Sequence, residues 1–361
     1  MSLGFGENKM TRRSIVVIIL ILAFLMVAGG YYWQSFKSPS PPTLEILRIG
    51  YLPIYPDAQF LVAYQLEWLN ELKKLGVEEI KIVKFEQGVA MIQAFAAGEL
   101  DVLYVGIDPV LVALEKGLPL RVVAANIMNP LALVGSKELA RYYEEYGSTF
   151  LEKWREDKGR PVRIATLPKG TTPHALLSMF FEKLGYDPNN PPAEVLPMGI
   201  GAVRAALLNN EVDAAMIMEP VVTIALEKGY TIIVEGREVL PGHPGAVLAV
   251  SLDLIKKRPD IVEKLVELHI KATSMLNDDK EKAAKILSDA IGTEVLPVEI
   301  ARKALNSPLS NFISNPHLIV NGTLEYQKFR VSYMGVKVTL KPSDIFETSF
   351  YDKLAGRGEK G

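Results

Sequence analysis

Two segments of the sequence repeat the same order of structural signals, and this repeat constrains the fold more than any other feature. In Phe95–Pro109 and in Leu207–Pro220, a helical stretch ends, an Asp leads into a short apolar run, and an acidic residue followed by Pro opens another helical stretch. Strands that alternate with helices in this order form largely parallel sheets covered by helices. We therefore expect an α/β protein with two similar lobes, joined by strands that cross between them.

Apolar runs and helical periodicity predict the elements of both lobes. The first series of strands is expected at residues 48–52, 80–85, 102–105, 120–127 and 131–134, with helices at 58–75, 89–97 and 108–116. A polar helical stretch at 139–157 separates it from a second series, with strands at 162–167, 193–198, 214–218 and 231–234 and a return strand at 245–251. Further helices are expected at 261–276, 280–290, 298–305 and 324–334, followed by a frayed tail at 354–361.

The composition excludes several classes of protein. The chain has 361 residues, no Cys and four His, and none of the His has the spacing of a helical metal site. Disulfides, iron–sulfur clusters and a dedicated metal centre are therefore not expected. Lys and Arg total 40 against 42 Asp and Glu, which gives a net charge of −2 and argues against a nucleic-acid partner. We expect no cofactor.

The N-terminal region predicts the compartment. Ser14–Phe36 carries no charge, and about 20 apolar residues suffice to span a bilayer. Lys9, Arg12 and Arg13 precede this run, and such basic residues favour the cytoplasmic side. We expect residues 1–36 to be a cytoplasmic flank and membrane anchor, residues 37–43 a stiff Pro/Ser linker, and the rest to lie outside the cytoplasm. A cleaved signal peptide is the alternative, although the run ends in bulky aromatic residues.

Four segments carry a resemblance to a known family. Arg48–Leu69, Phe85–Ala124, Val162–Tyr186 and Gly199–Pro220 together resemble the nitrate/sulfonate/taurine/thiamine-precursor group of ABC-transporter solute-binding proteins. The likeness covers Leu44–Ile291. It implies a type II periplasmic-binding-protein fold and no enzymatic activity. It also implies a receptor whose lobes close over a small solute and then dock on a membrane permease.

The repeat and the return strand also predict the division of the chain. Lobe I is expected to combine residues 44–131 with 246–334, and lobe II to comprise residues 132–245. Residues 335–361 would form a C-terminal extension, and the helices after Ile291 have no counterpart in the resemblance. We expect the protein to be a monomer.

The candidate ligand-binding residues follow the expected strands, because ligands of open α/β sheets bind at the carboxyl ends of strands, near helix N-termini. The loop Pro168–His174 is the strongest local signal, since it opens a helix whose free N–H groups attract an anion. Simple capping by Thr172, with Pro173 at the first helical position, is the alternative. The full set is Tyr55, Asp57, Gln59, Gly106, Asp108, Lys169, Gly170, Thr171, Thr172, His174, Met198, Gly199 and Glu219.

The chemistry of this set favours an organic solute. Tyr55 suits stacking or hydrogen bonding, whereas Asp57 and Asp108 are equally well explained as helix caps. Glu219 can bind an amine, although a carboxylate at a helix start also suits the helix dipole. The candidate loops contain no Arg to fork a sulfonate or phosphate. A zwitterionic or heterocyclic solute is therefore favoured over a bare inorganic anion.

Two other functions stay open at this point. One is an enzyme of the pyrimidine-synthase kind, which shares the fold of the resembled family, but the Cys-rich motif of that branch is absent. The other is a membrane-anchored sensor ectodomain, for which the short segment before the anchor offers little room for an output domain.

Overall fold

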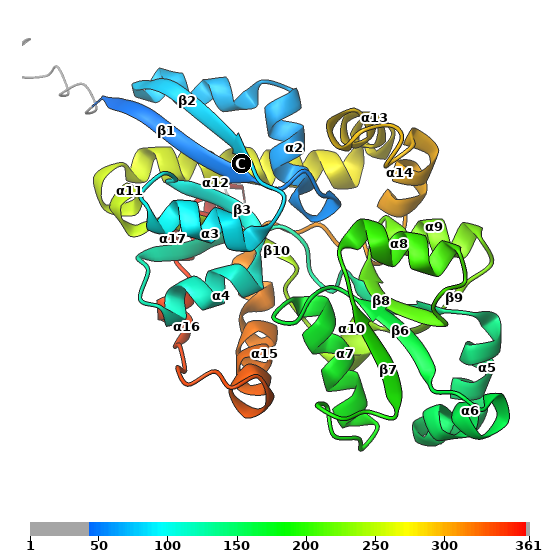
Figure 1. Ribbon diagram of the computed structural model, residues 1–361. Coiled ribbons are helices and arrows are strands. Elements are labelled where there is room, and N and C mark those ends of the chain that lie inside the picture. Colours follow the sequence, from blue (N-terminus) through cyan, green and yellow to red (C-terminus); the bar gives the residue numbers. More distant parts are fainter. Residues whose placement is uncertain (1–42, 359–361) are drawn as a thin grey trace, which may run out of the picture. The chain divides into compact units, whose positions relative to one another are not determined.

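Figure 1 shows the computed structural model of the chain, which describes residues 43–358. The described residues from Leu44 onward form one compact unit. The expected anchor at 14–36 and nearly all of the expected linker lie outside the described residues. Between residues 43 and 358, no helix combines the length and the apolarity needed to cross a bilayer.

The first sheet has the strand order β2-β1-β3-β10-β4. β1 lies parallel to both β2 and β3, whereas β10 runs antiparallel to both β3 and β4. β3, β4 and β10 are almost wholly buried, as the unbroken apolar runs predict. The strands are β1 Leu44–Tyr51, β2 Val77–Lys84, β3 Val102–Gly106, β4 Leu120–Ala125 and β10 Ala246–Ser251, and helices α2 Ala58–Gln65, α3 Gly88–Ala96, α4 Ile107–Glu115, α11 Leu252–Lys257 and α12 Pro259–Asp278 accompany them.

The second sheet has the order β7-β6-β8-β5-β9. β6 lies parallel to β7 and β8, and β5 runs antiparallel to β8 and β9. Its strands are β5 Leu131–Gly135, β6 Val162–Thr166, β7 Ala193–Pro197, β8 Ala214–Met218 and β9 Thr231–Glu235. Its helices are α5 Lys137–Tyr146, α6 Phe150–Lys158, α7 Thr172–Lys183, α8 Ile200–Leu208, α9 Val221–Glu227 and α10 Gly236–Val239.

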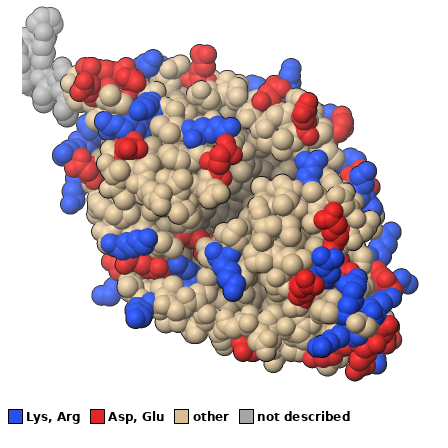
Figure 2. Space-filling view, in the orientation of Figure 1, with Lys and Arg blue, Asp and Glu red and all other residues tan. Residues whose placement is uncertain are grey.

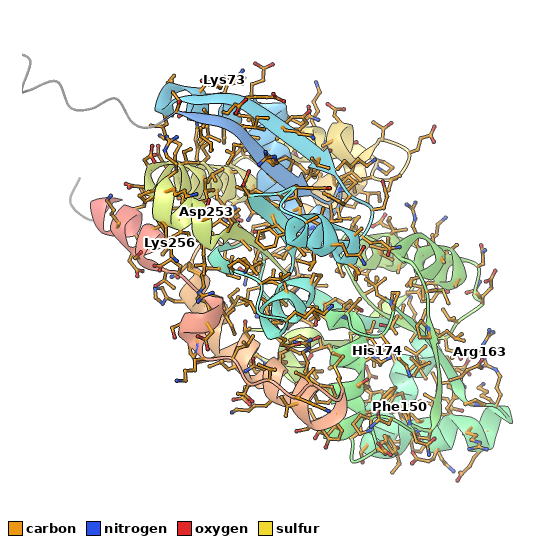
Figure 3. The ribbon with its side chains drawn as sticks, turned by 60° about the vertical axis from the view of Figure 1, so that its left-hand side comes forward. Lys73, Phe150, Arg163, His174, Asp253 and Lys256 are labelled. Atoms are coloured by element: carbon orange, nitrogen blue, oxygen red, sulfur yellow. The ribbon has the colours of Figure 1, made fainter. Side chains whose placement is uncertain are left out.

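The two sheets therefore have the same arrangement, with β2, β1, β3, β10 and β4 matching β7, β6, β8, β5 and β9. The expected α/β class with two sheets is confirmed. In each sheet the antiparallel strand, β10 or β5, is the one that the chain enters from the other sheet. Figure 3 shows Arg163 on β6 and Phe150 and His174 on helices beside the second sheet, and Asp253 and Lys256 on α11.

The chain passes between the sheets through two crossing segments, residues 125–129 and 243–246. They are hydrogen-bonded to one another, with Asn129 N donating to His243 O at 2.9 Å and Gly245 N to Ile127 O at 3.0 Å. A Cβ on Gly245 would lie 2.6 Å from the Ile127 side chain, so this close approach requires glycine.

A third segment, residues 310–314, lies beside the first crossing segment. Met128 N donates to Asn311 O at 3.0 Å, and Ile313 N donates to Asn126 O at 3.0 Å. This segment belongs to the C-terminal region, whose helices are α13 Lys280–Ile291, α14 Val298–Leu305, α15 Val320–Tyr333, α16 Pro342–Ile345 and α17 Ser349–Gly358.

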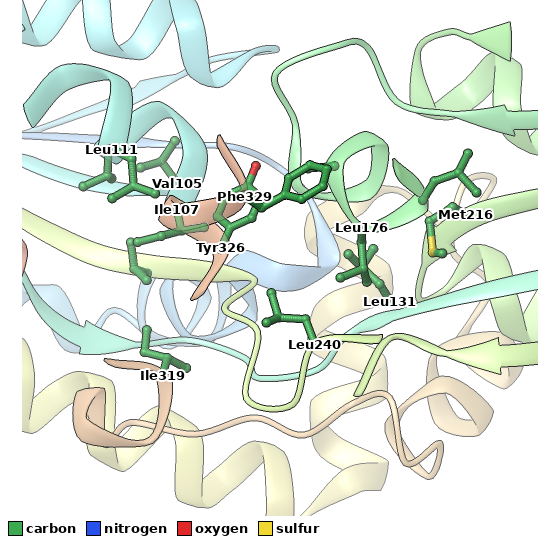
Figure 4. Close-up of a cluster of buried hydrophobic side chains, with 14 of the residues drawn as sticks. Val105, Ile107, Leu111, Leu131, Leu176, Met216, Leu240, Ile319, Tyr326 and Phe329 are labelled. Carbon is green, nitrogen blue, oxygen red and sulfur yellow. The ribbon is translucent and has the colours of Figure 1, made fainter. Parts of the chain in front are cut away.

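The C-terminal region packs on both sheets. α14 lies against α9 as well as α13, and the buried Leu309 belongs to an apolar cluster of the second sheet. Figure 4 shows how side chains of α15 and of the turn before it meet residues of both sheets in one buried cluster. The labelled members are Val105, Ile107, Leu111, Leu131, Leu176, Met216, Leu240, Ile319, Tyr326 and Phe329.

Two expectations about helices are wrong. The predicted helix 58–75 is broken at Glu67, whose φ of 57° is left-handed, and continues as a 3₁₀ helix over Trp68–Leu75. The break lets Leu69 and Leu72 bury themselves while Lys271 of α12 sits 3.8 Å from the Trp68 ring centroid. The prediction of a frayed tail at 354–361 is wrong for residues 354–358, which belong to α17; this helix packs on α12 and places Leu354 against the first-sheet core. Residues 359–361 lie outside the described residues.

Candidate functional site

Several helices begin after the carboxyl ends of strands with no hydrogen bond from the side chain of the N-cap residue. α3, α4, α7 and α8 have Gln87, Gly106, Thr171 and Gly199 as N-cap residues, and no side chain of these accepts a hydrogen bond there. By contrast, α5, α11 and α13 are capped by the side chains of Ser136, Ser251 and Asp279. Uncapped first-turn N–H groups from both sheets are the usual means of holding a polar ligand in this class of fold.

Figure 2 shows the surface hollowed between the two halves of the compact unit, with walls made largely of uncharged residues. The first residues of α3 and α8 carry exposed apolar side chains, since Val89 is 64% and Ile200 37% exposed. Two cavities have volumes of about 420 Å³, one between α9 and α14 and the other between α7, α10 and α15. Across residues 43–358, no three His, Asp or Glu side chains are grouped so that they could hold a metal ion.

Asp108 and Thr172 are brought together, although they start helices that belong to different sheets. Thr172 Oγ1 donates to Asp108 Oδ2, and Tyr326 of α15 donates its hydroxyl to Asp108 Oδ1. Arg330 of α15 lies with Nε 4.0 Å from Asp108 Oδ1 and forms a bidentate pair with Glu115, at 2.5 and 3.2 Å. Burial is the largest influence and raises the pKa of Asp108, while its hydrogen-bond donors and Arg330 act to lower it.

The rest of the predicted anion loop is more open. Lys169 and Gly170 are exposed, and Gly170 adopts a left-handed φ of +87°. Thr171 Oγ1 donates to Pro168 O at 2.7 Å, so this hydroxyl serves the loop itself. His174 is half-buried, and burial, followed by the nearby Lys169 charge, lowers its pKa.

Tyr55, Asp57 and Gln59 are buried, and protein groups use their polar atoms. The Tyr55 hydroxyl bonds to Ser310 at 2.8 Å. Asp57 accepts from Leu52 N and Asn126 Nδ2, both at 3.2 Å, and burial raises the pKa of Asp57 to about 8.

The side-chain amide nitrogen of Gln59 is likewise hydrogen-bonded to protein groups. Gln59 Nε2 donates to Asn126 O at 2.6 Å, while Gln59 Oε1 is buried without a hydrogen-bond partner among the described residues. In this conformation Asp57 and Gln59 hold Asn126 of the first crossing segment, whereas Tyr55 holds the third segment through Ser310.

Glu219 follows β8 and is only 1% exposed. Its Oε2 accepts from Thr223 N at 2.9 Å, and burial is the main cause of its raised pKa. Burial raises the pKa of Tyr55, and the negative charge of Glu219 adds a smaller effect in the same direction. Met198 is half-buried and Gly199 exposed at the start of α8, and Gly106 is half-buried at the start of α4.

Several polar residues of this region escaped the sequence reasoning. Tyr326 and Arg330 stand four residues apart on one face of α15, but they lie beyond the segment that carries the resemblance. Asn126 lies inside an apolar run, and a single Asn in such a run was the only sign of a buried polar contact there. Ser310 lies in an irregular segment, where the sequence gave no sign of its contact with Tyr55.

Comparison with known proteins identifies the family of this chain. The model of the NMT1-like family matches residues 40–290. The taurine-binding periplasmic protein of Escherichia coli (strain K12) is 27% identical over 195 residues, which are 52% of this chain and 55% of that protein. The match therefore spans about half the length of that relative.

Solved structures share the fold at low identity. The periplasmic nitrate-binding protein NrtA from Synechocystis PCC 6803 superposes with a TM-score of 0.69 at 13% identity, over 89% of this chain and 91% of that one. The periplasmic aliphatic sulphonate binding protein SsuA from Escherichia coli gives 0.68 at 17% identity, over 85% and 94%. All three are binding proteins by name.

Proposed function

Because this chain belongs to the NMT1-like family, we propose that it is the extracytoplasmic solute-binding component of an ABC importer. The observation that carries the proposal is that α3 and α4 of the first sheet and α7 and α8 of the second begin after strands with no hydrogen bond from their N-cap side chains. The starts of α4 and α7 are joined across the two sheets by Asp108 and Thr172. Such a site supplies fixed hydrogen-bond donors that can hold a solute, and it does not require catalytic groups. The named relatives support binding in preference to catalysis.

The proposed mechanism is closure of a type II clamshell over a small organic or anionic solute. Residues 44–131 with 246–334 would form lobe I and residues 132–245 lobe II, since the strands fall into two sheets along this division. A solute that contacts both lobes only in the closed form shifts the population towards that form. The closed protein, a monomer held at the membrane through residues 14–36, would then dock on its permease.

Thermal-shift titration is the first test. A panel of sulfonates, nitrate, amino acids and pyrimidines should contain a compound that stabilises the fold, by about 2.7 kcal/mol at 100 times its Kd. Recovery of the compound chemically unchanged after incubation would separate binding from turnover by an enzyme.

A distance measurement tests closure itself. The chain has no Cys, so Glu99→Cys with Asn190→Cys places one dye on each proposed lobe at exposed positions. Energy transfer should rise when the stabilising compound is added. A matched pair within lobe I, Glu99→Cys with Lys81→Cys, should not respond. A bound solute that leaves the first pair unchanged would contradict the clamshell mechanism.

A further inference from the structure

The Asp108 carboxylate is the meeting point of three parts of the chain. Asp108 lies in the first turn of α4 and is 3% exposed. One oxygen accepts from Thr172 of α7 and the other from Tyr326 of α15. Arg330 places a guanidinium nitrogen, Nε, 4.0 Å away, and this nitrogen is buried without another partner among the described residues.

Every polar neighbour of this carboxylate is a donor. A protonated Asp would need one of the two hydroxyls to turn round and accept its O–H, whereas an ionised carboxylate accepts from both as they stand. The positive ends of two helices, α4 and α7, also act on the same carboxylate. The surroundings therefore suit an anion, and Asp108 supplies it.

Most of the backbone donors at the start of α7 are not open to a solute. Thr171 N donates to Pro168 O at 3.2 Å, the Thr172 backbone acts on the Asp108 carboxylate, and Pro173 has no N–H. The Thr172 hydroxyl also points its proton at Asp108. A solute anion at this helix start would have to displace a carboxylate that is covalently part of the protein.

We propose that Asp108 is a specificity-determining residue: it occupies the anion-binding start of α7 from the opposite sheet and thereby selects against solutes that present an anionic group there. The inference rests on the proposed solute-binding function and narrows its solute class. A solute of this protein presents a neutral or cationic group towards Asp108 and Thr172. A bare oxyanion meets a fixed negative charge instead of free N–H groups.

The test is calorimetric titration of the full chain in detergent with ethanesulfonate and with nitrate at pH 7.5. The wild type should show no saturable binding of either anion. Asp108→Ala, which vacates the helix start, should bind at least one of them with a Kd about tenfold or more below the limit that the wild-type titration sets, a change of ~1.4 kcal/mol. The gain should fall as NaCl is raised, because it is electrostatic.

Asp101→Ala is the matched control, because Asp101 precedes β3 at the end opposite to Asp108 and its loss changes the net charge equally. It should not create anion binding. If Asp108→Ala does not fold, Asp108→Asn keeps the side-chain volume and is titrated in its place. Saturable binding of ethanesulfonate or nitrate to the wild type, or equal behaviour of the Asp108 and Asp101 variants, would overturn the proposal.

The proposed function can fail separately. One outcome would separate the two proposals: no compound of the thermal-shift panel binds the wild type, but the Asp108 variant gains anion binding. The inference about Asp108 would then stand, and the proposed solute-binding function would be refuted.

Discussion

Gly322, in the first turn of α15, lies directly on the backbone of Gly242, beside the second crossing segment. A Cβ on Gly322 would be 2.0 Å from the Gly242 carbonyl oxygen and 2.9 Å from His243 N. Backbone atoms cannot move aside as a flexible side chain can. The contact therefore fixes where the C-terminal region meets the connection between the two sheets.

Gly322→Ala should destabilise the protein by about 3 kcal/mol, because overpacking against backbone forces a local shift. Chemical denaturation monitored by tryptophan fluorescence measures the loss. Gly356→Ala in α17, where an added Cβ meets nothing within 4 Å, is the control and should raise the free energy of unfolding slightly, by up to about 1 kcal/mol, since Ala favours a helix more than Gly does. Equal stability of the two variants would show that α15 can be displaced from Gly242 without cost.

Asp57 should make stability depend on pH. Burial raises the pKa of Asp57 to about 8, so the folded state retains a proton that the unfolded state releases near pH 4. The free energy of unfolding then falls as the pH rises from about 4 to about 8, by up to about 1.4 kcal/mol per pH unit. Asp57→Asn should flatten this part of the profile. Asp253→Asn, at a side chain 70% exposed, should leave the slope intact.

Leu309 should anchor the C-terminal region to the second sheet. Its side chain is 2% exposed and packs in a cluster with residues of α8 and α9. Leu309→Ala should cost about 2–5 kcal/mol in the free energy of unfolding, the usual range for a buried leucine. Leu318→Ala, at a position 48% exposed, should cost less than about 0.5 kcal/mol. A small effect at Leu309 would mean that the region is not part of the folded core.

The Tyr326 hydroxyl should contribute to stability through Asp108. Tyr326→Phe removes one donor from a buried carboxylate and should cost about 1–3 kcal/mol. Tyr333→Phe removes a hydroxyl that donates to Glu182 at an exposed site and should cost under about 0.5 kcal/mol. Thermal denaturation at neutral pH compares the two. If their melting temperatures drop equally, burial of the Asp108 contact has no energetic consequence.

Residues 14–36 should hold the protein at the membrane. The full chain should sediment with membranes and resist extraction by high salt, and a variant that starts at residue 43 and is exported by a foreign signal should be released in soluble form. Mass spectrometry of the full chain gives the complementary reading. A mature protein that begins after residue 36 would establish the cleaved signal peptide instead.

The sequence predicted the strands well because their signals are local. Asp101 directly precedes the short apolar run of β3, and Asp213 directly precedes that of β8. Such short, unbroken apolar runs predict buried strands. The left-handed turn at Glu67 was not foreseen because the apolar spacing continues through it without interruption.

The site depends on contacts that sequence periodicity does not contain. Tyr55 meets Ser310 and Asp108 meets Tyr326 across more than 200 residues. An aromatic residue or an acid in a loop after a strand therefore has the same local signature whether it faces a solute or another part of its own chain. Placing Asp108 required the position of α15.

The row formed by residues 125–129, 243–246 and 310–314 has a mechanical consequence. Three backbone segments hydrogen-bonded side by side can turn together about one line, because such a rotation leaves their mutual bonds unbroken. Twisting or sliding of one half past the other would break several of these bonds at once. For the closure that we propose, this row therefore predicts a rotation about one line and not a sliding movement.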